Sequence, residues 1–273
     1  MVAFIDTLAS GARDLGIDLD AGMVELFERY QRELVEWSRR MNLSAIESEE
    51  EVAAKHFLDS LTCVLAVDLP EGCSVADVGS GAGFPGVVLK VARPSIKLTL
   101  IEASRKRTEF LRHIADVLGL GDVEVVWDRA ERLGRMPNHR ESHDVAVARA
   151  VAELAVLAEL CLPLVRIGGA LVAQKGPRAS EEVAGAVTAV EAMGGRVDRL
   201  IPASLPLGYG ERTLVVIRKE SPTPGKYPRR PGIPEKRPIR SEPRGKSQSL
   251  TEDSPRTRIG RKMARSPRLQ RDR

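Results

Sequence analysis

Aromatic residues and cysteines are scarce in this chain of 273 residues, and long apolar runs are missing. Aromatic residues make up 4%, against 42% hydrophobic and 29% charged residues, which excludes collagen-like, disulfide-scaffold and wholly disordered proteins. The three cysteines, Cys63, Cys73 and Cys161, form an odd set without a CxxC spacing. We therefore expect buried free thiols rather than a disulfide framework or a zinc ribbon, in a chain long enough for one or two domains.

The sequence shows no signal for secretion or for insertion into a membrane. Asp6 comes early, and no basic segment precedes an apolar run at the start, unlike a secretory signal. Glu159 and Arg166 interrupt the best apolar run, so it is too short for a membrane span. We expect a cytoplasmic protein in a reducing compartment, monomeric and without a membrane partner.

Charge is unevenly distributed along the chain. Residues 222–273 hold 16 Lys/Arg against 5 Asp/Glu, and 9 of the 17 prolines, whereas the preceding residues hold 26 basic against 33 acidic side chains. Because large apolar side chains are too few to offset the entropy cost of ordering the backbone, residues 221–273 are expected to form a basic, Pro/Arg-rich tail that is largely disordered. Such a tail attracts polyanions, although a solvated extension without a partner has the same composition.

Residues 1–70 are expected to form a helical extension packed on the main domain. From Met23 onward, apolar side chains recur at spacings of three and four, which is typical of an amphipathic helix. Ser48 and Glu51 have the spacing of a capping box, so a further helix is predicted from Ser48 to about Val67.

Residues 71–220 show the pattern of a Rossmann-like, doubly wound α/β domain. Short runs rich in β-branched apolar residues alternate with longer segments of helical periodicity. Because each run is nearly all apolar, helices should cover both faces of a mostly parallel sheet. The last two runs are joined by a Pro/Gly-rich connection too short for a helix, which predicts an antiparallel terminal hairpin. The predicted strands are 74–78, 96–101, 123–126, 144–148, 170–173, 197–201 and 212–217.

A glycine-rich loop follows the first predicted strand. Gly79, Gly81, Gly83 and Gly86 lie where this strand ends and a helix begins. Positions without side chains allow a tight turn and the close approach of a ligand, and the helix N-terminus offers unpaired N–H groups. Glu102 ends the second strand about 20 residues further on, where a carboxylate can accept hydrogen bonds from ribose hydroxyls. The ligand should therefore contain adenosine.

Three features favour S-adenosylmethionine over a dinucleotide. The strand ends at Val78, so the motif GxGxxG read from Gly79 places Phe84 where Gly or Ala is needed. Asp77 directly precedes the loop, well placed for the amino group of a methionine moiety and badly placed for a pyrophosphate. The terminal hairpin matches the usual sheet of class I S-adenosylmethionine-dependent methyltransferases. A register that starts at Gly81 does satisfy GxGxxG, which keeps a nicotinamide or flavin cofactor, or a structural glycine turn, as alternatives.

Several stretches together resemble one family, the bacterial 16S rRNA guanine-N7 methyltransferases called RsmG or GidB. The resemblance covers about residues 20–240, and the tail beyond is longer than the family pattern requires. It implies methyl transfer to N7 of a guanine in a loop of 16S rRNA. The stretches that carry it are Asn42–Ile46, His56–Leu61, Asp77–Gly86, Arg129–Glu131, Ala148–Ala152, Gln174–Gly176 and Tyr227–Gly232. The contacts to S-adenosylmethionine that it implies are at Gly79, Phe84, Ala130, Glu131 and Arg149.

The chemistry of this reaction needs few groups from the protein. Guanine N7 carries a lone pair and no proton at neutral pH, so catalysis rests on proximity and electrostatic fit, and no catalytic residue is predicted. Arg149 lies at the carboxyl end of the fourth strand, the sheet edge where ligands bind. Lys175 could meet an RNA phosphate at the same edge, and Arg229 and Arg230 could add contacts from the tail.

The expected cofactor is S-adenosylmethionine, and the expected partner is 16S rRNA or the small ribosomal subunit particle. The histidines show no metal-ligand spacing, so no metal site is predicted. Two other functions stay open on the residues alone. One is a nicotinamide-dependent oxidoreductase, and the other is a non-catalytic RNA-binding factor for ribosome assembly with a retained cofactor pocket.

Overall fold

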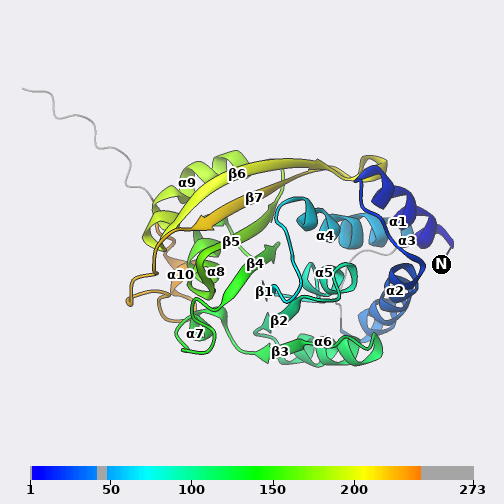
Figure 1. The fold of residues 1–273 in the computed structure, drawn as a ribbon, viewed down its shortest axis with the longest axis horizontal. Coiled ribbons are helices and arrows are strands. Elements are labelled where there is room, and N and C mark those ends of the chain that lie inside the picture. Colours follow the sequence, from blue (N-terminus) through cyan, green and yellow to red (C-terminus); the bar gives the residue numbers. More distant parts are fainter. Residues whose placement is uncertain (1, 42–47, 241–273) are drawn as a thin grey trace, which may run out of the picture. The chain divides into compact units, whose positions relative to one another are not determined.

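The computed structural model describes residues 2–41 and 48–240. They contain a seven-stranded sheet with the strand order β3-β2-β1-β4-β5-β7-β6 (Figure 1). The predicted sheet is confirmed, because β1 to β5 run parallel and β7 is antiparallel to both β5 and β6. No helix in the described ranges is long and apolar enough to cross a membrane. The strands are β1 (Ser74–Val78), β2 (Lys97–Glu102), β3 (Val123–Trp127), β4 (His143–Arg149), β5 (Val165–Lys175), β6 (Gly195–Ser204) and β7 (Glu211–Lys219).

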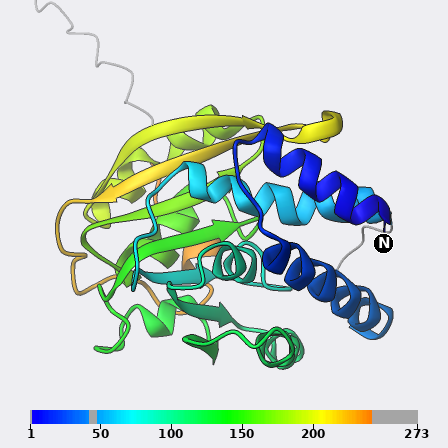
Figure 2. The ribbon, with the colours of Figure 1, turned by 45° about the vertical axis from the view of Figure 1, so that its right-hand side comes forward.

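Helices cover both faces of the sheet, as the apolar strands predict (Figures 1 and 2). Alternate residues of β4 enter different cores: Val145 and Val147 belong to one, and Ala146 and Ala148 to the other. The first core is covered by α1 (Val2–Asp14), α2 (Ala21–Met41), α5 (Gly86–Ala92) and α6 (Arg105–Val117). The second is covered by α7 (Ala130–Leu133), α8 (Leu154–Cys161) and α9 (Ala179–Ala192).

The N-terminal helices are attached to the sheet domain through aromatic packing around Phe57. Its ring makes edge contacts with Phe4, Phe27 and Tyr30, with centroid separations of 5.0, 5.6 and 5.2 Å. All four side chains are fully buried. Such offset and edge-on pairs stabilise a core beyond the area that they bury. The helical segment therefore shares one core with the sheet.

The predicted helix from Ser48 is present, with an irregular middle. The Ser48 hydroxyl accepts a hydrogen bond from the Glu51 N–H at 3.2 Å and caps α3 (Glu49–Val52). A π-helical stretch follows at η1 (Ala53–Leu58), and then α4 (Asp59–Leu61) and the 3-10 turn η2 (Thr62–Leu65). Wider turns of this kind release backbone carbonyls from the α-helical pattern, and here they face the end of β4.

The expectation of a largely disordered tail from residue 221 is corrected for residues 221–240. This segment crosses the flank of α7 and α8 and includes the short helix α10 (Ile233–Lys236). Arginines of the domain bind its carbonyls: Arg140 donates to Thr223 and Tyr227, and Arg135 donates to Lys226 and Pro228. The prediction counted apolar side chains inside the tail and missed these partners in the domain. Residues 241–273 lie outside the described residues.

Candidate functional site

Different structural constraints explain why glycine occupies four positions of the loop between β1 and α5. Gly79, Gly81 and Gly83 have φ values of 72°, 60° and 95°, which favour glycine. A Cβ at Gly83 would overlap the Tyr30 hydroxyl, and one at Gly86 would lie 2.6 Å from Asp77 Oδ2, so these two positions are small because the protein packs against them. At Gly81 the nearest atom would be a backbone oxygen at 3.8 Å, which leaves open space beside the loop.

Asp77 supports this loop from beneath. Its carboxylate is fully buried, and Oδ2 accepts a hydrogen bond from the Gly86 N–H at 3.0 Å. The other oxygen, Oδ1, is buried and has no hydrogen-bond donor among the described residues. Burial raises the pKa of Asp77 to about 7, against the smaller lowering by the Gly86 hydrogen bond. The sequence placed Asp77 at a methionine amino group, whereas its contacts in the structure are with the loop itself.

The raised pKa of Asp77 predicts a pH-dependent stability of the free protein. The pKa of Asp77 is higher in the folded protein than in the unfolded chain. The contribution of Asp77 to stability is therefore fully present below the pKa of the unfolded chain and is lost as the pH rises through about 7. Between about pH 5 and about pH 8, the Asp77→Asn variant should therefore lose less unfolding free energy than the unmodified protein. Urea denaturation at both pH values measures this, with Asp68→Asn at an exposed position as the control. Equal losses in all three proteins would contradict the assignment.

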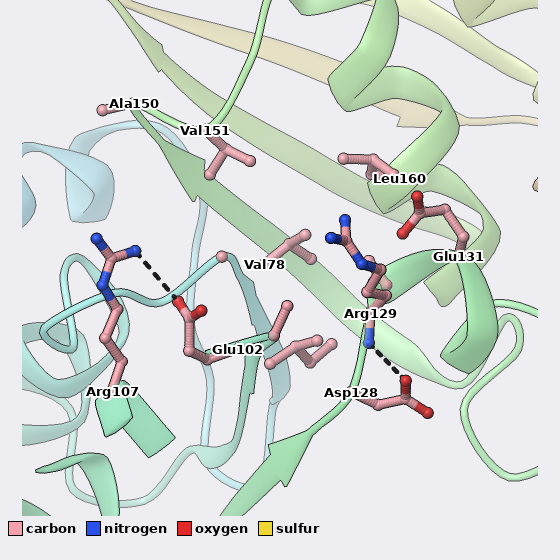
Figure 3. A pocket seen from close by; sticks show the side chains of 13 residues that line it. Val78, Glu102, Arg107, Asp128, Arg129, Glu131, Ala150, Val151 and Leu160 are labelled. Atoms are coloured by element: carbon pink, nitrogen blue, oxygen red, sulfur yellow. Dashed lines mark hydrogen bonds and ion pairs between the residues drawn. The ribbon is translucent and has the colours of Figure 1, made fainter. Parts of the chain in front are cut away.

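A cavity of about 280 Å³ opens at the carboxyl ends of β1 to β4 (Figure 3). Glu102 closes one side: its Oε2 accepts from the Gly81 N–H at 3.0 Å, and its Oε1 accepts from the Ser104 N–H at 2.7 Å. Each carboxylate oxygen can accept a second hydrogen bond. Glu102 thus fixes the glycine loop and keeps acceptor capacity toward the cavity. The cavity is lined by Val78, Gly79, Ile101, Glu102, Ala103, Arg107, Asp128, Arg129, Ala130, Glu131, Ala150, Val151 and Leu160.

Ala130 and Glu131, which begin α7, form the opposite wall. The Glu131 side chain is 5% exposed and lies beside Leu160 (Figure 3). Its Oε1 accepts a hydrogen bond from the backbone N–H of Gly232 at 2.8 Å. The C-terminal segment is therefore attached directly to the wall of the cavity, which the sequence did not reveal.

The Phe84 and Arg149 side chains turn toward the N-terminal helices, and neither lines the cavity. The Arg149 guanidinium donates to the Lys55 carbonyl at 2.9 Å and pairs with Asp59 at 3.3 Å. It also lies over the Phe84 ring at 5.0 Å, and His56 stacks on the same ring at 4.8 Å. The residues after Arg149 reach the cavity instead. These two side chains hold the loop and β4 against the helix that starts at Ser48.

Known proteins are similar to this chain over most of its length. A family model described as GidB, rRNA small subunit methyltransferase G, matches residues 23–204. A relative from Pelotomaculum thermopropionicum is 50% identical over 239 residues, which cover 88% of this chain and all of the relative. A second, from Roseiflexus sp., is 51% identical over 236 residues, covering 86% of this chain and all of the relative. Both are named ribosomal RNA small subunit methyltransferase G.

The chain belongs to this family. The resemblance read from the sequence motifs is thereby confirmed. Among solved structures, a SAM-dependent methyltransferase from Aquifex aeolicus is similar over 64% of this chain and 96% of its own, with 20% identity and a TM-score of 0.46.

Two of the three side chains predicted to hold the RNA of this methyltransferase, Lys175 and Arg229, are engaged in ion pairs within the protein. Lys175 is 8% exposed, pairs with Glu182 at 2.7 Å and donates to the Ala152 carbonyl. Arg229 binds both oxygens of Glu159, at 2.6 to 3.0 Å. Charge and chain position suggested free cations, but each has a nearby carboxylate as its partner. Arg230 is exposed.

Sequence reasoning missed Arg107. This side chain lines the cavity beside Glu102, across from Arg129 (Figure 3). Sequence reasoning also missed Glu159, the buried partner of the C-terminal segment. A signal for Glu159 existed, because it is the lone charge within the apolar run of α8. Within residues 2–41 and 48–240, no cluster of three His, Cys, Asp or Glu side chains could hold a metal ion.

Proposed function

We propose that this methyltransferase transfers the methyl group of S-adenosylmethionine to N7 of a guanine in 16S rRNA. Membership of the rRNA small subunit methyltransferase G family carries the proposal, together with the position of the cavity. In open α/β sheets, ligands bind at the carboxyl ends of the strands where the strand order reverses, which here is the edge formed by β1, β2 and β4.

The residues around the cavity fit S-adenosylmethionine. Glu102 has lone pairs left for the two ribose hydroxyls, and the open space beside Gly81 lies next to this carboxylate. The unpaired oxygen of Asp77 is an acceptor suited to an ammonium group that reaches beneath the loop. When bound, S-adenosylmethionine supplies a methyl group activated by the positive sulfonium.

The protein's own part in the reaction is then to bind, orient and exclude water. Guanine N7 attacks with its in-plane lone pair, so no side chain has to remove a proton. The product base is cationic, which makes a buried positive charge near the base unfavourable. Arg149 pairs with Asp59, a carboxylate that it shares with Arg212, and burial lowers the pKa of His56 to about 3, so that the His56 ring is neutral. The neutral His56 ring therefore adds no positive charge here.

Replacement of Glu102 by alanine should weaken binding of S-adenosylhomocysteine by about 1.5–3 kcal/mol, the range for a hydrogen bond to a charged group. The variant loses the acceptor for ribose and also the support of the Gly81 N–H. Calorimetric titration measures the change. Glu124→Ala, at an exposed position on the edge strand β3, is the control and should bind normally. An unchanged dissociation constant for Glu102→Ala would place the ribose elsewhere.

The proposed reaction is tested by incubating the protein with S-adenosylmethionine labelled on the methyl group. The substrates are 16S rRNA and small subunit particles from cells that lack the enzyme, and the digested nucleosides are then separated. We expect the label in 7-methylguanosine. Label in another nucleoside would overturn the assignment to N7. Tight binding of S-adenosylhomocysteine without any transfer would favour the non-catalytic assembly factor instead.

We infer that the enzyme acts as a monomer in the cytoplasm and recognises either free 16S rRNA or the small subunit particle. The exposed side chain of Arg230 supports a contact from the C-terminal segment, next to the buried Arg229 pair. Comparing initial rates on deproteinised rRNA and on particles separates the two substrates.

A further inference from the structure

With Lys175 and Arg229 engaged in ion pairs, the cations available to RNA lie elsewhere. A group of exposed side chains lies around the mouth of the cavity, at the start of α6 and the end of β3. We call this group the rim surface; its members are Arg105, Lys106, Arg107, Trp127 and Arg129. Arg107 and Arg129 also line the cavity itself (Figure 3).

Trp127 is the most unusual member of the rim surface. It is the last residue of β3, and 54% of it is exposed although tryptophan is normally well buried. The indole N–H donates to the Ala103 carbonyl at 3.0 Å, and the Arg105 guanidinium lies 5.8 Å from the ring centre. These contacts hold the ring in one orientation without covering it. Because Ala103 lines the cavity, the exposed ring stands directly beside the cofactor site.

Two of the four cations of the rim surface have no ion-pair partner among the described residues. Lys106 and Arg129 make no side-chain hydrogen bond or ion pair with the described residues. Arg107 is 51% exposed and lies 3.9 Å from Glu102. Arg105 pairs with Glu109 at 3.1 Å. Since residues 1–221 hold 26 basic against 33 acidic side chains, this local excess of positive charge stands out on an acidic body.

We propose that the rim surface docks an unpaired rRNA segment beside the target guanine, with one base stacked on Trp127 and adjacent phosphates on Lys106, Arg107 and Arg129. This inference rests on the proposed function. An exposed aromatic ring framed by cations fits single-stranded nucleic acid, which presents base faces and phosphates together. Paired RNA hides its base faces, so the segment has to be a loop or an unstacked end.

In this arrangement the protein can bind the RNA independently of the cofactor. The stacked base lies outside the cavity, because Trp127 donates to Ala103 in the wall but does not line the cavity itself, so the cofactor can bind without displacing the base. Phosphates on Arg107 and Arg129 lie at the cavity mouth. The neighbouring nucleotide can then enter the site from this side.

The test uses the full-length protein with Trp127→Ala, Trp127→Phe and Lys106→Glu. Lys97→Glu serves as the matched control, since Lys97 is exposed at the first residue of β2, on the opposite edge of the sheet. For each variant, the dissociation constant of S-adenosylhomocysteine, the KM and kcat for 16S rRNA, and binding of a labelled single-stranded RNA oligonucleotide at several salt concentrations are measured.

We expect Trp127→Ala to raise the KM for rRNA and to weaken oligonucleotide binding about 5- to 150-fold, the range for loss of one stacked base. Trp127→Phe should recover most of the lost affinity. Lys106→Glu should lower the slope of log affinity against log salt concentration by the amount expected for about one phosphate contact. Affinity for S-adenosylhomocysteine should stay within about twofold of the unmodified protein in every variant.

Normal RNA binding by both Trp127→Ala and Lys106→Glu would overturn the inference. An effect on whole particles but not on deproteinised rRNA or the oligonucleotide would also overturn it, because the rim surface would then contact a protein. The oligonucleotide assay needs no methyl transfer. A failure of the unmodified protein to form 7-methylguanosine therefore counts against the proposed reaction alone.

Discussion

Replacement of Arg229 by alanine should lower the free energy of unfolding by about 3–5 kcal/mol, because it leaves a buried carboxylate without its partner. Glu159 lies in α8 and is 1% exposed. Arg229 satisfies it with its side chain at 2.6 to 3.0 Å and with its backbone N–H at 2.8 Å. The Arg229 side chain keeps 26% exposure, so water can replace part of the pair and the lower figure is the better expectation.

Urea denaturation of Arg229→Ala and Arg230→Ala gives the measurement and its control. The two arginines are neighbours in sequence, but Arg230 is exposed, and its replacement should change stability by no more than about 0.5 kcal/mol. Adding Glu159→Gln to Arg229→Ala should recover part of the loss, since the unpaired charge is then gone. If Arg229→Ala and Arg230→Ala unfold alike, the ion pair does not hold the C-terminal segment on the domain.

The sheet could be predicted because its signal is local in the sequence. Runs such as Val145–Ala148 are apolar at every position, and only a strand between two covered faces uses side chains on both sides. The hairpin of β6 and β7 was predictable because its connection leaves no room for a helix. The N-terminal helices followed from periodicity, and the Ser48 cap from a three-residue spacing.

The C-terminal segment could not be predicted in this way. Residues 221–240 contain few large apolar side chains, and their order comes from arginines of the domain that bind backbone carbonyls. Such hydrogen bonds join residues more than 80 positions apart, and backbone acceptors leave no trace in composition. The buried charge of Glu159 was the one visible hint, because an isolated carboxylate inside an apolar helix requires a partner.

The candidate site likewise contains residues whose positions were predictable from the sequence and residues whose positions were not. Gly79, Gly81 and Glu102 were predictable, because the end of a strand and the next strand's last residue meet at one sheet edge. The direction of the Arg149 side chain was not predictable. Its partners Lys55 and Asp59 lie about 90 positions away, within and directly after a π-helical stretch that no sequence pattern indicates. Sequence thus placed the loop and its acceptor, whereas the packing of the helical extension decided where the Arg149 side chain turned.

A valine at position 81 should weaken S-adenosylhomocysteine binding at least about 100-fold, an energy of about 2.8 kcal/mol, while the protein stays folded. A Cβ here meets no protein atom closer than 3.8 Å, so the added methyl groups would fill the open space beside the Glu102 carboxylate. The φ of 60° adds a strain of about 1–2 kcal/mol that a folded protein of this size can tolerate.

Gly119→Val separates this backbone strain from loss of the ligand. Gly119 has a φ of 61°, and a Cβ there also has open space around it, but Gly119 follows α6, whereas the Gly81 N–H donates to the Glu102 carboxylate in the cavity wall. Both variants should therefore lose similar stability in thermal unfolding without ligand, and only Gly81→Val should lose the stabilisation by S-adenosylhomocysteine. Calorimetric titration of both gives the affinities. If Gly81→Val binds the ligand as Gly119→Val does, the space beside Gly81 is not where the cofactor lies, and Glu102 must serve the loop alone.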